Sequence, residues 1–393
     1  MNSEGASWTV RQGDCRELLA TLHAESVHCC VTSPPYWGLR DYGTAKWEGG
    51  DPECDHLNGN LVSPKSTLRN DGREHTGPYD GEKTVSTGMP YKGVCGKCGA
   101  VRVDAQIGLE VTPEAYVTHI VEVFREVRRV LRKDGTCWLN LGDCYATGAS
   151  SARLPGGKCF GKQNKVVAAG DYPVSQPNRR SLKGLKPKDL IGIPWRAAFA
   201  LQADGWWLRS DIIWAKTNCM PESVADRPTK AHEYIFLLAK SQTYYYDAKA
   251  VTEDSVGSTK GAAASFRRVD SKRGVSLCPN SPMPTHRAER DGTTYDGPTR
   301  NRRTVWTVAS EPCPEAHFAT YPTKLIEPCI LAGCPIEGTV LDPFCGSGTT
   351  GVVALRHGRK FIGIELNPAY VEMARGRIER DAPLLNVGGV PHA

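Results

Sequence analysis

A strand, a glycine turn and the start of a helix follow one another within residues 340–350, and this unit constrains the fold most. Val340-Leu341-Asp342 is apolar until its last residue, and Cys345-Gly346-Ser347-Gly348 separates it from Thr349-Thr350. Glycines let a backbone approach a ligand closely, and the first turn of a helix offers it unpaired N–H groups. The turn lacks the Gly-Lys-Thr of a phosphate loop, so the pattern does not support nucleoside triphosphate binding.

A carboxylate, Glu365, ends the next expected strand, which spans residues 360–366, and lies 23 residues after Asp342. An acid at this point of a strand–helix–strand unit is placed to accept hydrogen bonds from both ribose hydroxyls of a nucleoside cofactor. A third glycine, Gly351, follows the turn as in dinucleotide folds. The alternative interpretation of Glu365 is a solvated acid at a strand end.

A second unusual strand exit lies near the other end of the chain. The apolar run Val27–Val31 leads into Thr32-Ser33-Pro34-Pro35-Tyr36-Trp37, and two prolines cannot continue a strand ladder. The result is a stiff loop with a serine hydroxyl, bare carbonyls and two aromatic rings. Such a loop can accept hydrogen bonds from an amine while stacking on a planar group; the alternative is a proline-rich strand exit with core aromatics.

Strands and helices alternate along most of the chain, which is typical of an α/β fold with a mostly parallel sheet. We expect strands at 8–10, 135–143, 206–214, 232–240 and 339–342, and helices at 15–19, 113–132, 187–203, 323–332 and from 349. Residues 38–110 are poor in apolar residues and predict a long insertion. Residues 146–186 and 252–303 are polar and basic, as in loops that contact phosphates; a disordered basic linker is the alternative.

The insertion contains Cys54-x-His56 and Cys95-x-x-Cys98-Gly99. A Cys-x-x-Cys followed by glycine is typical of half a zinc knuckle, so we predict a structural zinc site with ligands Cys54, His56, Cys95 and Cys98. His75 is a substitute ligand, and reduced free cysteines in a loop are the alternative. A metal would also explain how so apolar-poor a stretch folds.

Asp-Pro-Phe-x-Gly-x-Gly-Thr-Thr at 342–350, together with the loop at 32–37, resembles the DNA amino-methyltransferases. These enzymes transfer a methyl group from S-adenosylmethionine to adenine N6 or cytosine N4. The order, proline loop first and glycine turn last, is similar to their β class, and the resemblance extends over most of the chain. Residues 214–216, 226–227 and 232–233 resemble a late catalytic segment of the class, and residues 317–325 one that closes over the cofactor.

Together with the zinc site predicted from the cysteine spacing, this resemblance implies a Rossmann-like methyltransferase fold with a zinc-ribbon-like insertion and an irregular basic target-recognition region. It implies catalytic roles for Ser33, Pro34, Pro35 and Tyr36. The cofactor contacts that it implies are Asp14, Thr32, Lys324, Asp342, Pro343, Phe344, Gly346, Gly348, Thr349, Glu365 and Asn367. The implied domains are a catalytic half (1–37 and 111–251), the insertion (38–110), the recognition region (252–310) and a cofactor half (311–393).

The implied reaction is site-specific methylation of a flipped base in double-stranded DNA. Both adenine-N6 and cytosine-N4 enzymes can have a serine at the position of Ser33. We favour adenine N6 as the target because adenine enzymes are commoner, with cytosine N4 as the alternative. More remote alternatives are an RNA or protein amide methyltransferase and a non-catalytic DNA-binding protein. The resemblance also implies a homodimer. No nuclease motif is evident in this chain, so a restriction endonuclease partner would be a separate protein, and an orphan enzyme is the alternative.

The chain opens without the basic and apolar regions of a secretory signal and has no apolar run of membrane-spanning length. The 15 cysteines are spread through apolar segments instead of forming a short disulfide framework. We therefore expect no membrane partner and a cytoplasmic location. With the family resemblance, we expect a bacterial or phage-encoded protein that associates with the nucleoid.

Overall fold

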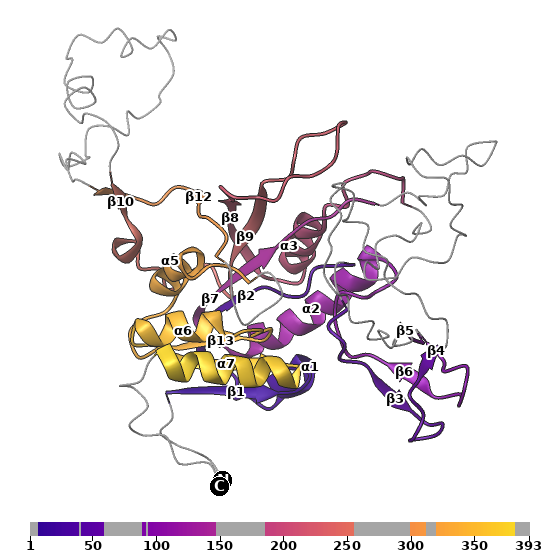
Figure 1. Cartoon of the computed structure of the whole chain (residues 1–393). Coiled ribbons are helices and arrows are strands. Elements are labelled where there is room, and N and C mark those ends of the chain that lie inside the picture. Colours follow the sequence, from indigo (N-terminus) through magenta and orange to yellow (C-terminus); the bar gives the residue numbers. More distant parts are fainter. Residues whose placement is uncertain are drawn as a thin grey trace, which may run out of the picture.

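The computed structural model describes residues 7–38, 41–58, 89–91, 93–146, 185–254, 299–311 and 320–381, and its centre is an eight-stranded sheet (Figure 1). The strands, in sheet order, are β1 (Trp8–Gln12), β14 (Lys360–Glu365), β13 (Thr339–Asp342), β2 (Val27–Thr32), β7 (Leu131–Leu141), β9 (His232–Ala239), β8 (Trp207–Ala215) and β12 (Val305–Thr307). Only β9 runs antiparallel to its neighbours in this sheet. The predicted mostly parallel sheet is confirmed.

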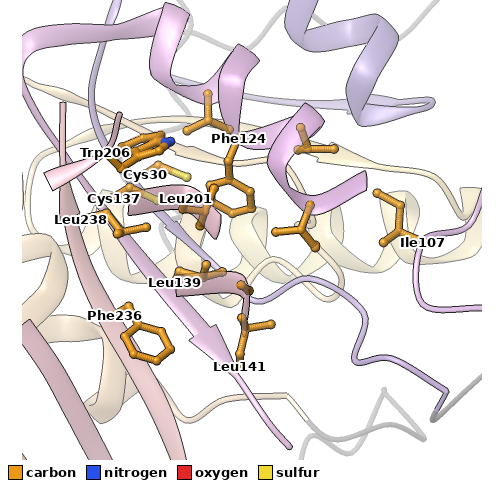
Figure 2. Close-up of a cluster of buried hydrophobic side chains, with 14 of the residues drawn as sticks. Cys30, Ile107, Phe124, Cys137, Leu139, Leu141, Leu201, Trp206, Phe236 and Leu238 are labelled. Carbon is orange, nitrogen blue, oxygen red and sulfur yellow. The ribbon is translucent and has the colours of Figure 1, made fainter. Parts of the chain in front are cut away.

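Helices cover both faces of the sheet. One face packs against α1 (Cys15–Ala20), α2 (Pro113–Val130) and α3 (Ile193–Ala203), and the other against α5 (Thr323–Gly333), α6 (Thr349–Arg356) and α7 (Pro368–Asp381). Successive strand residues therefore enter different cores: Cys30 packs beneath α2 with Phe124, as Figure 2 shows, while Cys29 packs on the opposite face. Each fully buried Leu or Phe contributes about 1.5–3 kcal/mol.

Two predicted helix boundaries were wrong, and one helix was missed. The helix predicted to reach residue 132 ends at Val130, because Leu131 takes an extended backbone and continues directly into β7. The helix predicted from 187 begins at Ile193, after Gly192 in the left-handed region; Asp143 Oδ1 accepts from the N–H groups of Gly192 and Ile193. Helix α7 was not predicted.

The insertion forms two small ladders apart from the sheet. β3 (Lys46–Glu48) pairs with β6 (Val101–Val103), and β4 (Leu57–Asn58) with β5 (Met89–Pro90). Figure 1 shows both ladders beside α2, away from the helices α5–α7. A short helix (Lys249–Val251) and the β10 (Glu253–Asp254)–β11 (Thr299–Arg300) pair precede β12.

Most of the two basic segments, at 147–184 and 255–298, and the candidate ligand His75 lie outside the described residues. Among the helices that the structure describes, none is long and apolar enough to cross a membrane.

Candidate active site

A cavity of about 490 Å³ lies where the parallel strands β2, β13 and β14 reach their carboxyl ends. Doubly wound sheets bind ligands at this edge, and the volume suits a cofactor together with part of a substrate. The proline loop Ser33–Tyr36, the turn Pro343–Ser347 and Glu365 all line this one cavity. Two motifs separated by three hundred residues therefore meet because their strands lie side by side in the sheet.

Asp342 organises the glycine turn from behind. Its Oδ1 accepts from Thr32 Oγ1 at 2.6 Å and from the Phe344 N–H at 3.1 Å. Its Oδ2 accepts from Thr350 Oγ1 at 2.6 Å and from the Tyr321 hydroxyl at 3.0 Å. Burial raises the pKa of Asp342, and these donors act in the opposite direction. The carboxylate is fully buried, so it fixes the turn and does not itself line the cavity.

Glu365 lies on the floor of the cavity with both oxygens anchored. Oε2 accepts from the Gly346 N–H at 2.8 Å and Oε1 from the Asn367 N–H at 2.9 Å. Burial raises the pKa of this carboxyl group. Each oxygen keeps one free lone pair, so the two carboxylate oxygens can accept hydrogen bonds from the two hydroxyls of a diol. Asp14, which caps α1 and pairs with Arg16 at 2.5 Å, lines the same side.

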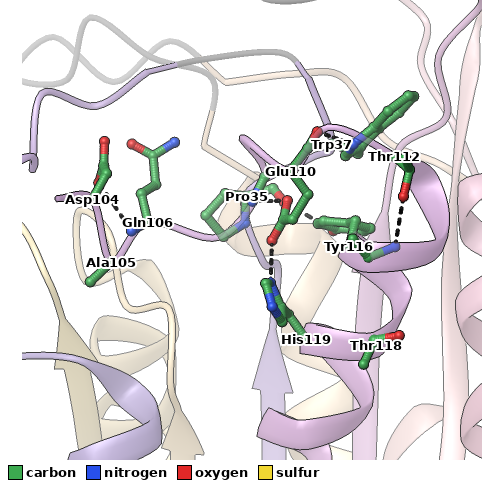
Figure 3. Close-up of polar contacts among 12 residues, drawn as sticks. Pro35, Trp37, Asp104, Ala105, Gln106, Glu110, Thr112, Tyr116, Thr118 and His119 are labelled. Carbon is green, nitrogen blue, oxygen red and sulfur yellow. Dashed lines mark hydrogen bonds and ion pairs between the residues drawn. The ribbon is translucent and has the colours of Figure 1, made fainter. Parts of the chain in front are cut away.

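Helix α2 and the end of the insertion hold the proline loop in place (Figure 3). The Tyr116 hydroxyl donates to the Pro35 carbonyl at 2.9 Å, and Trp37 Nε1 donates to the Glu110 carbonyl at 3.0 Å. Trp37 is buried in the core behind the loop. The loop is therefore fixed from one side, which leaves Ser33, Pro34 and Tyr36 facing the cavity.

The Tyr36 hydroxyl is held by acceptors from two neighbouring strands. It lies 2.6 Å from Glu233 Oε2 and 2.9 Å from Asn140 Oδ1, and Lys216 forms an ion pair with the same Glu233 carboxylate. Burial and the charge of Glu233 raise the pKa of Tyr36, so the hydroxyl stays protonated and acts as a donor.

The ring of Tyr36 packs directly on Gly142, where an added Cβ would lie 2.4 Å from Tyr36 Cε2. Ser33 Oγ donates to the Tyr36 hydroxyl oxygen across 3.5 Å, at the limit of a hydrogen bond. The contacts of the ring and the hydrogen bonds of the hydroxyl together restrict the Tyr36 side chain to one orientation.

The structure brings most of the predicted site residues to the cavity. All four predicted catalytic residues line it, as do Asp14, Pro343, Phe344, Gly346, Thr349 and Glu365. Thr32, Asp342, Gly348 and Asn367 are not part of the lining. Lys324 is exposed on α5 and is not brought to the cavity.

Sequence reasoning missed the roles of Asn140, Lys216 and Glu233. The segments 214–216 and 232–233 carry part of the family resemblance, but the local pattern does not show that β9 runs antiparallel to β7. That direction carries Glu233 to the same edge as the carboxyl end of β8, where Lys216 follows. The predicted metal ligands lie elsewhere, in the insertion, with their four ligand atoms within 4.8 Å of one another.

A doubly wound sheet whose carboxyl edge joins a Pro-Pro-Tyr loop to a glycine turn defines the class of amino-methyltransferases. A family model described as DNA methylase (N6/N4) matches residues 27–376. The chain belongs to this family and is a DNA methyltransferase.

Its relatives include the Type II methyltransferases M.Cfr9I of Citrobacter freundii and M.SmaI of Serratia marcescens, each 40% identical over 94% of this chain and over 87% and 89% of the relative. The solved structure of the PvuII DNA methyltransferase (cytosine-N4-specific) has the same fold, with a TM-score of 0.50, 16% identity and coverage of 98% of this chain and 95% of that one.

Proposed function

We propose that the cavity holds S-adenosylmethionine beside the glycine turn and a flipped base of double-stranded DNA beside the proline loop, and that the enzyme methylates the exocyclic amine of that base. The observation that carries this proposal is the single cavity lined by both motifs. When bound, the cofactor supplies an activated methyl group on a sulfonium.

The chemistry of the lining fits a nucleoside cofactor. Glu365 offers two anchored oxygens to the ribose hydroxyls, and the glycine turn keeps backbone close to the ligand, with Gly346 in the left-handed region (φ 51°). Asp14, Pro343, Phe344 and Thr349 complete this side as the proposed contacts. Thr32 and Asp342 support the turn from behind, Gly348 is the N-cap of α6, and the Asn367 N–H donates to Glu365 Oε1. We propose no role for Lys324.

The proline loop addresses the weak nucleophilicity of the amine. The nitrogen of a ring-conjugated amine delocalises its lone pair into the ring. Two acceptors that hydrogen-bond to its two N–H groups would draw the nitrogen towards a tetrahedral geometry and free that lone pair. Ser33 Oγ and the Pro34 carbonyl are the proposed acceptors. Transfer of the cofactor's methyl group would form the carbon–nitrogen bond as the carbon–sulfur bond breaks, the cofactor would leave as a neutral thioether, and one amine proton would pass to water. Fixed acceptors lower the barrier by positioning and preorganisation.

Tyr36 is the proposed stacking surface for the flipped base, with Pro35 shaping the loop beneath it. Flipping a base out of a duplex costs a few kcal/mol, so a ring already locked in place avoids a further ordering cost. Glu233 and Asn140 hold its hydroxyl and Gly142 its ring, which makes them positioning residues.

Modification sequencing of DNA from cells that express the protein tests the proposal. N6-methyladenine or N4-methylcytosine should be found within one recurring DNA sequence. The type of modified base distinguishes an adenine target, our first expectation, from a cytosine target. Cells expressing Ser33→Ala provide the control. Methylation of RNA or protein but not of DNA would overturn the proposal. We also propose a separate restriction endonuclease as a partner, in line with the Type II names of the relatives.

A further inference from the structure

We propose that Cys54, His56, Cys95 and Cys98 bind one Zn²⁺ ion, and that this ion stabilises the insertion as one wall of the cofactor cavity. The four come from two turns of the insertion, separated in sequence by residues 57–94. Their ligand atoms lie within 4.8 Å of one another. A closed set of three thiolates and one imidazole is typical of structural zinc.

Two distances within the cluster match the edges of a tetrahedral zinc site and not a disulfide. Cys54 Sγ lies 3.8 Å from Cys95 Sγ, far beyond the S–S bond of about 2.05 Å. Cys98 Sγ lies 3.5 Å from His56 Nδ1. With zinc–sulfur bonds of about 2.3 Å and zinc–nitrogen bonds of about 2.0–2.1 Å, a tetrahedron has edges of about 3.8 and 3.5 Å.

The backbone around the cluster is shaped to bring the ligands together. The Gly99 N–H donates to the Cys95 carbonyl at 2.9 Å, with Gly99 in the left-handed region (φ 76°). His56 also has a left-handed backbone (φ 51°), and its ring stacks on Trp47 with centroids 4.4 Å apart. An added Cβ at Gly50 would lie 2.8 Å from Cys98 Sγ.

The insertion has too little apolar core to fix this geometry by itself. Among its described residues from 41 to 103, only Cys95 and Ala100 are buried apolar side chains. Between the two turns that carry the ligands, the Lys97–Asp55 ion pair at 2.7 Å is exposed and adds little. An ion that replaces the missing core explains how the two turns stay together.

The same ladder leads from the cluster to the cofactor cavity. β3 and β6 pair directly beyond the ligands, and the residues at their other ends, Tyr42, Thr44 and Ala105–Ile107, line the cavity. Gln106 Oε1 accepts from the Tyr42 N–H at 2.8 Å. Asn367 Nδ2 donates to the Tyr42 carbonyl at 3.2 Å, and Asn367 follows Glu365, the last residue of β14. Release of the ion would therefore loosen this wall.

Metal analysis of the purified full-length protein tests the site, with one zinc per chain expected. Cys95→Ser and Cys98→Ser should lose it, while Cys219→Ser, a partly buried thiol outside the cluster, should keep it. In protein stripped by a chelator and reloaded with Co²⁺, visible absorption of tetrahedral thiolate-bound cobalt is expected. Equal zinc in all variants, or folded wild-type protein without zinc that also fails to bind Co²⁺, would overturn the site.

The role of the wall rests on the proposed function and has its own measurement. Stripped protein should bind S-adenosylmethionine about tenfold more weakly, the loss expected when about one hydrogen-bonded contact is disordered, and added Zn²⁺ should restore the affinity. Unchanged affinity after stripping would overturn the wall role alone. Failure of the zinc-loaded protein to bind S-adenosylmethionine would instead overturn the proposed function and leave the metal site standing.

Discussion

Ser33 is the side chain on which the proposed methyl transfer depends most, because its hydroxyl lines the cavity beside the Tyr36 hydroxyl. We expect Ser33→Ala to lower the single-turnover rate by about 10²-fold or more, since a fixed acceptor for an amine hydrogen is lost. The dissociation constant of S-adenosylmethionine should stay unchanged. Rapid-quench methyl transfer and equilibrium binding measure the two quantities.

The matched control for this substitution is Ser26→Ala, at an exposed serine that is outside the cavity lining. It should retain the wild-type rate. If Ser33→Ala also retained that rate, the loop would serve only as a strand exit, the alternative that its sequence leaves open.

At single residues, sequence reasoning reaches the groups that carry a local signature. The two prolines restrict the backbone and the paired glycines widen its conformational range wherever they occur, so Ser33–Tyr36 and Gly346 could be assigned to a site from the sequence alone. Glu233 has no such signature. It reaches Tyr36 only through the direction of β9 and its pairing with β8, and neither is encoded in the residues next to it.

Helix α6 packs unusually close to its neighbours at Gly351. An added Cβ there would lie 2.7 Å from both Phe361 of β14 and Ile378 of α7. We expect Gly351→Ala to lower the free energy of unfolding by about 1–3 kcal/mol through overpacking. Urea unfolding followed by circular dichroism measures it.

Gly376 of α7 is a helical glycine with room, because its added Cβ would meet only the flexible Arg380 side chain at 3.4 Å. Gly376→Ala should therefore raise the free energy of unfolding by roughly 0.5–1 kcal/mol, the gain in helix propensity. Equal effects of the two substitutions would show that packing at Gly351 is not the cause.

The junction of β2 and β13 contains a histidine that must be neutral. His28 Nδ1 accepts from the Thr339 N–H at 3.0 Å, and burial, with Arg132 and Lys360 nearby, lowers the pKa of His28 despite the opposing charge of Asp134. Its contribution to stability is complete above the unfolded pKa of about 6.5 and is lost as pH falls towards the folded value.

His28→Asn keeps an acceptor but cannot titrate. The urea midpoint of the wild type should therefore fall more between pH 7.5 and pH 5.5 than the midpoint of this variant. The same decrease in both proteins would assign the acid sensitivity to other groups.

The central sheet is assembled from both ends of the chain. β13 fills the position between β2 and β14, and β14 in turn pairs with β1. We expect a fragment of residues 1–275 expressed alone to be insoluble, because the edge of β2 and one core face would be exposed. Co-expression with residues 276–393 should restore a soluble complex, as measured by size-exclusion chromatography. A monodisperse, folded fragment of residues 1–275 would show that the two parts are separate domains.

The pairing of β1 with β14 also has a consequence in time. About 350 residues separate Trp8 from Lys360, and ribosomes add roughly 5–20 residues per second, so β1 waits roughly 20–70 s for its neighbour during synthesis. During most of translation β1 therefore has no neighbouring strand, and its backbone N–H and C=O groups remain unpaired. Chaperones that cover such edges should matter more for the yield of this protein than for proteins whose neighbouring strands are made in succession.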